Sequence, residues 1–134
     1  MPHTSIHPPE LFDARRSGFA QVVVTEGKRT VYLSGQVAWG PERTIVGVGD
    51  FAAQVDEAFK NLGHAMHAAG GGLADVVSLR IYIVQTHMAE NAAVRDGLLK
   101  YFPGENPPAS TWIGVAGLAH PDFLIEIEAI AVLN

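Results

Sequence analysis

The 134-residue sequence contains no cysteine, which excludes a disulfide scaffold, a thiolate zinc site and a catalytic thiol. Basic residues are also few: 9 Lys and Arg stand against 14 Asp and Glu, for a formal net charge of −5. Binding to nucleic acid depends on Lys and Arg neutralising phosphates, so this balance argues against a nucleic-acid partner.

Long apolar runs are also missing. The apolar stretch at 124–133 contains two glutamates and is shorter than the ~20 residues that span a bilayer. Residues 1–13 hold prolines and histidines but no apolar segment of the kind found in secretory signals. We therefore expect a cytoplasmic protein with no membrane association. The length fits one domain, and no repeat or linker interrupts it, so residues 1–134 are predicted to form a single domain.

Hydrophobic periodicity predicts seven elements. Strands are expected where β-branched and bulky residues cluster, at 19–26, 30–39, 75–84, 110–115 and 124–133. Helices are expected where apolar residues recur at helical spacing, at 51–69 and 88–102. Asp50 is placed to cap the first helix, and the glycines from Gly70 onward are placed to end it. This order predicts an α+β fold, a mixed sheet with two helices packed on one face.

The last two predicted strands alternate in polarity. In one, Glu126 and Glu128 alternate with apolar residues, and in the other Trp112 belongs to the set that alternates with Thr111 and Ile113. We expect an apolar face under the helices and an opposite face that combines Trp112 with the two carboxylates. In a chain that is 48% hydrophobic, such a face favours packing against another subunit around a polar pocket.

The ordered motifs resemble the RidA family, also called YjgF. The resemblance is carried by Pro108-Ala109-Ser110-Thr111-Trp112, by Ile125-Glu126-Ile127-Glu128-Ala129-Ile130-Ala131-Val132 and by Ser34-Gly35-Gln36. It implies a chorismate-mutase-like fold and a homotrimer that binds a small molecule in clefts between subunits. For the best-known members it also implies hydrolysis of reactive enamines and imines, such as 2-aminoacrylate.

The resemblance assigns roles to individual positions. Glu126 matches the glutamate that helps to activate the hydrolytic water, and Gly35 matches a glycine at the end of the second strand. Phe19 stands where the family has a tyrosine, so that hydroxyl is missing. Trp112 stands where the family has a cysteine and would narrow the cleft. Glu128 has no such match and is interpreted as structural.

The main departure from the family is Ser110, which replaces the arginine that clamps the substrate carboxylate. A guanidinium forms a planar bidentate fork with a carboxylate, whereas serine offers one neutral hydroxyl. Deamination of 2-aminoacrylate is therefore predicted to be weak. Arg95, which replaces a family asparagine, is a candidate to replace the clamp from another direction; the alternative is a solvated helix arginine.

No cofactor or metal is expected. His64 and His67 lie three residues apart on the first helix, but no third ligand at a fixed spacing accompanies them. The leading prediction is a RidA-like enzyme that adds water to a small reactive metabolite, with Glu126 polarising the water. A non-catalytic small-molecule-binding protein with the same cleft is the alternative. A third hypothesis is an endoribonuclease or translation inhibitor, to which the acidic charge gives no support.

Overall fold

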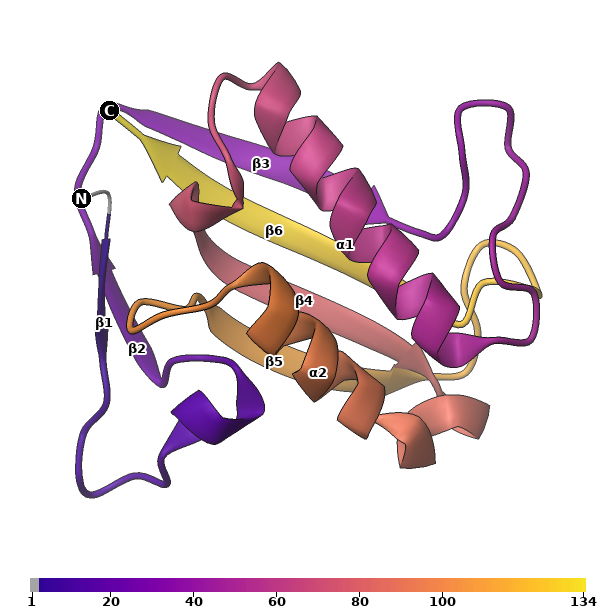
Figure 1. Cartoon of the computed structure of the whole chain (residues 1–134), viewed down its shortest axis with the longest axis horizontal. Helices are drawn as coiled ribbons and strands as arrows, with labels where there is room; N and C mark the ends of the chain where they lie inside the picture. The colour runs from indigo at the N-terminus through magenta and orange to yellow at the C-terminus, as the bar shows by residue number, and fades with distance from the viewer. Residues whose placement is uncertain (1–2) are drawn as a thin grey trace.

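The structure is a computed structural model that describes residues 3–134 (Figure 1). Three short 3-10 helices accompany the main elements, at Ala14–Ser17, Leu73–Asp75 and Gln85–Glu90. The main elements, in chain order, are β1 (His3–Ile6), β2 (Val22–Thr25), β3 (Arg29–Gln36), α1 (Phe51–Ala68), β4 (Val76–Val84), α2 (Ala92–Tyr101), β5 (Ala109–Val115) and β6 (Ile125–Leu133).

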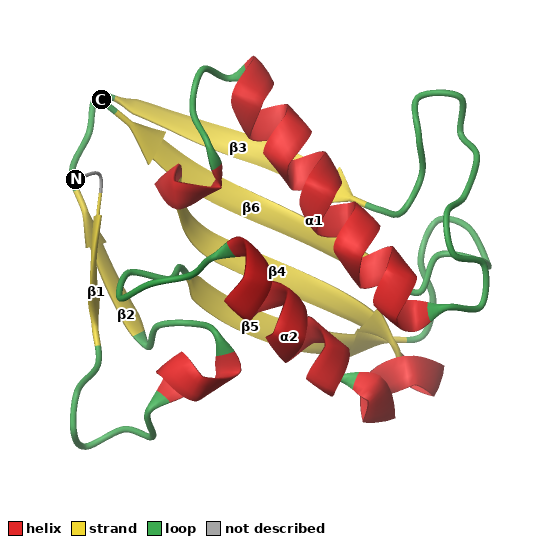
Figure 2. Cartoon of the chain, in the orientation of Figure 1, coloured by secondary structure: helices red, strands yellow, loops and turns green. Residues whose placement is uncertain are grey.

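The central sheet has four strands in the order β3-β6-β4-β5. β6 is antiparallel to both of its neighbours, whereas β4 and β5 are parallel and are joined through α2. Both helices pack on the same face of this sheet (Figure 2). The predicted α+β arrangement, a mixed sheet with two helices on one face, is therefore confirmed.

The first helix forms for the reasons that the sequence indicates. The Asp50 side chain accepts a hydrogen bond from the backbone N–H of Ala53 at 3.1 Å, which caps the free donors of the first turn. The stripe of apolar residues that faces the sheet is at most 2% exposed and comprises Val55, Phe59, Leu62 and Met66. Gly70 has a φ of +90°, a conformation that glycine adopts without steric cost, and it ends the helix as predicted.

The N-terminal strand was not predicted. β1 pairs with β2 in a separate two-stranded sheet, so the segment at 26–28 does not close a hairpin between β2 and β3. What holds β1 is distant in sequence: His3 Nε2 lies 2.8 Å from the carbonyl oxygen of Asn106, and Ser5 Oγ donates to Pro107 O at 2.6 Å. A strand of four residues fixed by contacts about a hundred positions away leaves little periodic signal.

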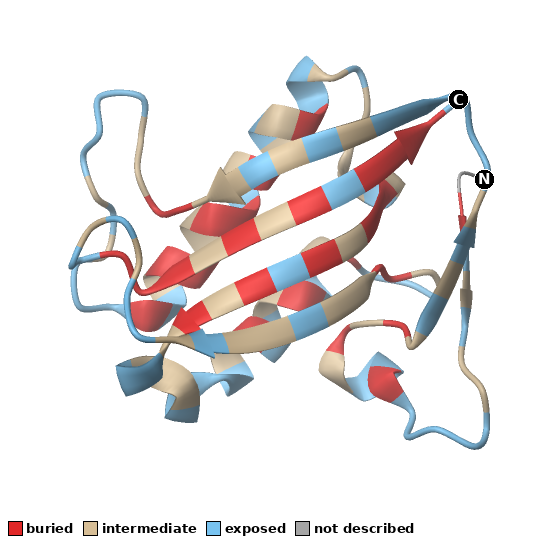
Figure 3. Ribbon diagram, turned by 180° about the vertical axis from the view of Figure 1, so that it is seen from behind, coloured by how far each residue is buried: buried red, intermediate tan, exposed pale blue. Residues whose placement is uncertain are grey.

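The face of the sheet opposite the helices is uncovered in one chain (Figure 3). Residues opposite one another on neighbouring strands point to the same face. Glu126 pairs with Tyr82 and Glu128 pairs with Arg80 on this open face, whereas Ile127 pairs with Ile81 beneath the helices.

The prediction that Trp112 shares a face with the carboxylates is wrong. Trp112 is paired with Ile81, which is fully buried on the helix-covered face, and it packs against the core there. Alternation within one strand shows which residues share a face, but it does not show which of the two sets in a neighbouring strand joins them. The open face of β5 instead carries Thr111 and Ile113.

Within residues 3–134, no helix is both long enough and apolar enough to cross a membrane.

Candidate active site

Glu126 lies on the open face near the start of β6, directly against the backbone of Gly35. A Cβ atom placed on Gly35 would overlap the Glu126 carboxylate, so this close approach requires glycine at position 35. The register of the β3–β6 pairing shifts between Leu33 and Gln36. Gly35 lies within this irregular segment, next to the Glu126 carboxylate. The structure therefore brings two of the predicted site residues together.

The two glutamates of β6 differ in their partners. Glu128 accepts a hydrogen bond from the Tyr82 hydroxyl at 2.5 Å and lies 3.9 Å from Arg80 Nη1. This hydrogen bond raises the pKa of Tyr82 above its ordinary value of 10.0. Glu126 has no hydrogen-bond or ion-pair partner among residues 3–134, although it occupies the same strand face two positions away. Glu126 is thus free to bind water or a ligand, whereas Glu128 is held in place.

Three other predicted residues form a second group at the edge strand β5. The indole Nε1 of Trp112 donates to Ser110 Oγ at 2.9 Å, and the ring centroids of Phe19 and Trp112 lie 6.1 Å apart. The segment that carries Phe19 is anchored because the N–H of Ala20 donates to the carbonyl oxygen of Pro108 at 2.9 Å. This group presents aromatic surface and one hydroxyl.

Arg95 belongs to neither group in one chain. It lies on α2, half-exposed, and its Nη2 donates to the Asp96 carboxylate at 3.1 Å. No hydrogen bond or ion pair among the described residues joins Arg95 to Glu126 or to Ser110. The structure therefore shows a solvated guanidinium next to an acidic neighbour.

The two groups lie on opposite faces of the sheet. Ser110 is paired with buried Leu79 on the covered face, and Glu126 is paired with Tyr82 on the open face. β4 separates their strands, which adds a lateral distance of roughly 10 Å at the usual strand spacing. One chain thus cannot present Ser110 and Glu126 to the same small molecule.

The open face also holds a cavity of about 360 Å³, of whose polar lining the sequence analysis, which expected a polar pocket on this face, named only Glu128 and Ser34. It lies across β3, β6 and β4 and is lined by Tyr32, Leu33, Ser34, Ser78, Arg80, Glu128, Ala129 and Ile130. The signal that could have found two of its polar members, Ser78 and Arg80, is the alternation of polar and apolar residues along β4. Among residues 3–134, no group of three or more His, Asp or Glu is arranged to hold a metal ion.

Comparisons with known proteins assign the chain to a protein family. Residues 14–133 match the family described as Endoribonuclease L-PSP. The chain is 34% identical over 110 residues to the 3-aminoacrylate deaminase RutC of Acinetobacter baylyi, covering 82% of this chain and 84% of that protein.

Similarity to solved structures supports the same family. A Yersinia pestis protein of unknown function from the conserved Rid family, YyfB, superposes with a TM-score of 0.94 at 38% identity, covering 99% of this chain and 100% of that one. RidA from an Antarctic Psychrobacter superposes with a TM-score of 0.71 at 29% identity, covering 86% and 88%. The chain therefore belongs to the RidA (YjgF) family, which includes imine and enamine deaminases, and its mixed sheet with two helices on one face is the chorismate-mutase-like fold of that family.

Proposed function

We propose that this protein is a single-domain homotrimer that hydrolyses small reactive imines or enamines in clefts between its subunits. The observation that carries the proposal is the unpaired carboxylate of Glu126, held against Gly35 on a face that no helix covers. The similarity to a relative named as a 3-aminoacrylate deaminase supports the same reaction class.

In the proposed reaction, Glu126 accepts a proton from water as the water oxygen attacks the carbon of the C=N bond. The resulting carbinolamine then expels ammonia and leaves a carbonyl product. Glu126 gives the first proton to the imine nitrogen as the carbinolamine forms and then relays the hydroxyl proton of the carbinolamine to the departing nitrogen, so one water is consumed and the Glu126 carboxylate is regenerated. Such proton transfer by a positioned side chain contributes roughly 10²–10⁴-fold to a rate.

The assembly is part of the proposal because Ser110 and Glu126 lie on opposite faces of one chain. A second copy can bring its own Glu126 to the group formed by Phe19, Ser110 and Trp112. The open face offers apolar surface for such packing, since Tyr32 is 77% exposed and Ile130 is 37% exposed.

The preferred substrate follows from the group at β5. Ser110 replaces a guanidinium, so a substrate carboxylate has no bidentate partner there. Phe19 and Trp112 instead offer aromatic walls, and the exposed Phe12 extends them, with its ring centroid 6.2 Å from that of Phe19. We infer weak turnover of 2-aminoacrylate and a preference for uncharged imines with an apolar substituent.

Arg95 is the candidate that would change this preference. If its guanidinium leaves Asp96 and turns to a ligand in the assembled cleft, carboxylate ligands bind in spite of Ser110. Arg95→Ala is then expected to weaken the binding of a carboxylate ligand in calorimetry. Unchanged affinity would leave Arg95 as a solvated helix residue.

A non-catalytic small-molecule-binding protein is the second candidate, and the missing guanidinium at Ser110 is the observation that favours it. An endoribonuclease or translation-inhibitor activity is a weaker third candidate. It takes support from the description of the matching family, and the net charge of −5 weighs against it.

The experiment compares ammonia release by the wild type and by Glu126→Gln on two imine panels. One panel holds 2-imino acids made by an amino-acid oxidase, and the other holds uncharged imines made by an amine oxidase. Glu128→Gln is the matched control because it changes the same group on the same strand face. We expect Glu126→Gln to lower kcat at least about 100-fold with ligand affinity retained, and Glu128→Gln to keep most of the activity.

The other outcomes separate the candidates. A wild type that binds ligands in calorimetry but turns over no imine would support the binding protein. Full activity of Glu126→Gln would remove Glu126 from the mechanism.

A further inference from the structure

A hydrogen bond between two side chains of β5 sets the polarity of the group at this strand. The indole Nε1 of Trp112 donates to Ser110 Oγ at 2.9 Å, and Oγ makes no other hydrogen bond among residues 3–134. An indole N–H can only donate, so Oγ accepts this bond. The hydroxyl hydrogen of Ser110 is therefore left to donate to a ligand.

The bond from Trp112 also strengthens this donor. A hydroxyl oxygen that accepts a hydrogen bond is polarised and donates its own hydrogen more strongly. The side chains of Ser110 and Trp112 are both only partly exposed, so water screens the pair incompletely. Trp112 thus acts as a positioning residue that holds Ser110 as a donor.

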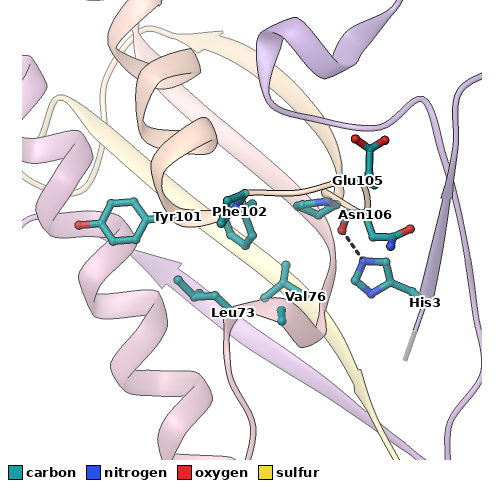
Figure 4. Close-up of a pocket in the computed structure, with 10 residues that line it drawn as sticks. His3, Leu73, Val76, Tyr101, Phe102, Glu105 and Asn106 are labelled. Atoms are coloured by element: carbon teal, nitrogen blue, oxygen red, sulfur yellow. Dashed lines mark hydrogen bonds between the residues drawn. The ribbon is translucent and has the colours of Figure 1, made fainter. Parts of the chain in front are cut away.

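The backbone that leads into Ser110 is anchored to the N-terminal part of the chain. Three successive carbonyl groups before Ala109 accept hydrogen bonds: Asn106 from His3 (Figure 4), Pro107 from Ser5 and Pro108 from Ala20. These bonds hold the hydroxyl in place before a ligand arrives, which lowers the entropy cost of binding.

The surroundings of this donor are aromatic and carry no paired cation. The ring of Phe19 lies 6.1 Å from that of Trp112, and Phe12, which is 67% exposed, extends this surface. No hydrogen bond, ion pair or cation–π contact within residues 3–134 joins a cationic side chain to Ser110 or Trp112. A carboxylate bound here would lack a counter-ion and would pair only one oxygen, whereas a neutral carbonyl oxygen is satisfied by one donor.

We propose that the hydroxyl of Ser110, held by Trp112, selects substrates that carry a neutral carbonyl group, as in an amide, ester or ketone, beside an apolar substituent. This inference rests on the proposed function and narrows its substrate class to imines that bear such an acceptor. The reaction itself is unchanged: water adds to the C=N carbon, ammonia leaves, and the neighbouring carbonyl group passes into the product intact.

The test compares two unreactive probes of the same shape. Acetophenone carries a carbonyl oxygen, and 2-phenylpropene carries a CH₂ group in its place. Calorimetry measures both affinities, and NMR of the ¹⁵N-labelled full chain shows whether the signals of Phe19 and Trp112 move. We expect Ser110→Ala to weaken acetophenone binding roughly two- to tenfold, the effect of one neutral hydrogen bond, and to leave 2-phenylpropene binding unchanged. Benzoate, which has a similar shape and a charge, should bind the wild type more weakly than acetophenone does.

Two further variants check that the hydroxyl is responsible. Ser110→Thr keeps a hydroxyl and should keep the preference for a carbonyl group. Thr111→Val is the matched control, because it removes a hydroxyl from the next position of β5, which lies on the open face. It should change the affinity of neither probe.

A double-mutant cycle tests the role of Trp112. Trp112→Phe keeps an aromatic ring but removes the N–H, so it should weaken acetophenone binding more than 2-phenylpropene binding. In the Ser110→Ala background this difference between the probes should vanish, because the hydroxyl that Trp112 holds is gone. A difference of the same size in both backgrounds would overturn the positioning role of Trp112.

Three results would overturn the selection of a carbonyl group. They are no measurable binding of acetophenone by the wild type, equal weakening of both probes by Ser110→Ala, or benzoate that binds as tightly as acetophenone. Imine hydrolysis that persists beside any of these results would leave the proposed function in place. Full activity of Glu126→Gln, by contrast, would count against the proposed function and would leave the probe preferences at Ser110 as measured.

Discussion

The two faces of the central sheet are built from the same strands but differ in burial and in the side chains that they carry. Beneath the helices, Leu79, Ile81 and Ile127 are at most 1% exposed and form the core. On the open face, alternate positions of the same strands carry Tyr82, Glu126 and further polar side chains that one chain leaves uncovered. The comparison teaches that the covered face determines the fold, whereas the open face is available for assembly and chemistry.

The largest expected effect is a loss of stability when the covered face is truncated. Ile127→Ala removes a fully buried side chain and should lower the free energy of unfolding by about 2–5 kcal/mol, since a cavity forms in addition to the lost transfer free energy. Urea denaturation at fixed protein concentration measures this. Thr111→Ala, at an exposed position of the open face, is the control, and we expect it to cost about 1 kcal/mol or less. Equal losses would remove the distinction between the faces.

A second prediction restores the missing clamp on the group at β5. Ser110→Arg should tighten the binding of a carboxylate ligand by about 10–100-fold, because hydrogen bonds to charged groups contribute roughly 1.5–3 kcal/mol each. Ammonia release from 2-aminoacrylate should rise in parallel. Ser110→Lys is the control, since it adds the same charge without the bidentate fork and should gain less. No gain in either variant would mean that position 110 does not face the substrate.

A smaller effect concerns the paired acid of the open face. The hydrogen bond to Glu128 raises the pKa of Tyr82, so Glu128→Gln should lower that pKa toward 10.0. A group whose folded-state pKa is raised contributes stability below its unfolded pKa and loses it as the pH rises through the folded value. Phenolate absorbance during an alkaline titration, with Tyr82→Phe to assign the signal, measures the shift. An unchanged titration would show that Glu128 is not held by Tyr82.

The smallest expected effect lies between the two helices. Asp56 of α1 accepts hydrogen bonds from Lys100 Nζ and the Tyr101 hydroxyl of α2, both at 2.7 Å, and these lower the pKa of Asp56 below 3.8. Asp56→Asn should cost about 0.5–1 kcal/mol at neutral pH, because water screens this partly exposed group.

The pH dependence of that cost has a definite sign. A lowered folded-state pKa contributes stability above pH 3.8 and loses it as the pH falls through the lowered value. Thermal unfolding of the wild type and of Asp56→Asn should therefore converge in acid. A difference that persists there would point to lost packing rather than to the carboxylate.

Sequence reasoning predicted the helices and the main sheet well because their apolar periodicity is local. It placed Glu126 and Glu128 on one face for the same reason, since two positions apart on one strand always share a face. It failed for Trp112, whose face depends on pairing with β4, and for β1, which is held by the loop at Asn106. Nothing local to Ser110 or Glu126 could reveal that the sheet lies between them.

The most direct test of the shared cleft is subunit complementation between two inactive variants. Glu126→Gln lacks the acid, and Ser110→Phe fills the opposite side of the cleft. If each cleft takes its acid from one copy and its aromatic group from the next, co-expression at equal levels makes about a quarter of all clefts intact, roughly one of three in each mixed trimer, and should recover about a quarter of the imine hydrolysis. A mixture no more active than the two parent variants, with mixed trimers confirmed by mass spectrometry, would contradict the account.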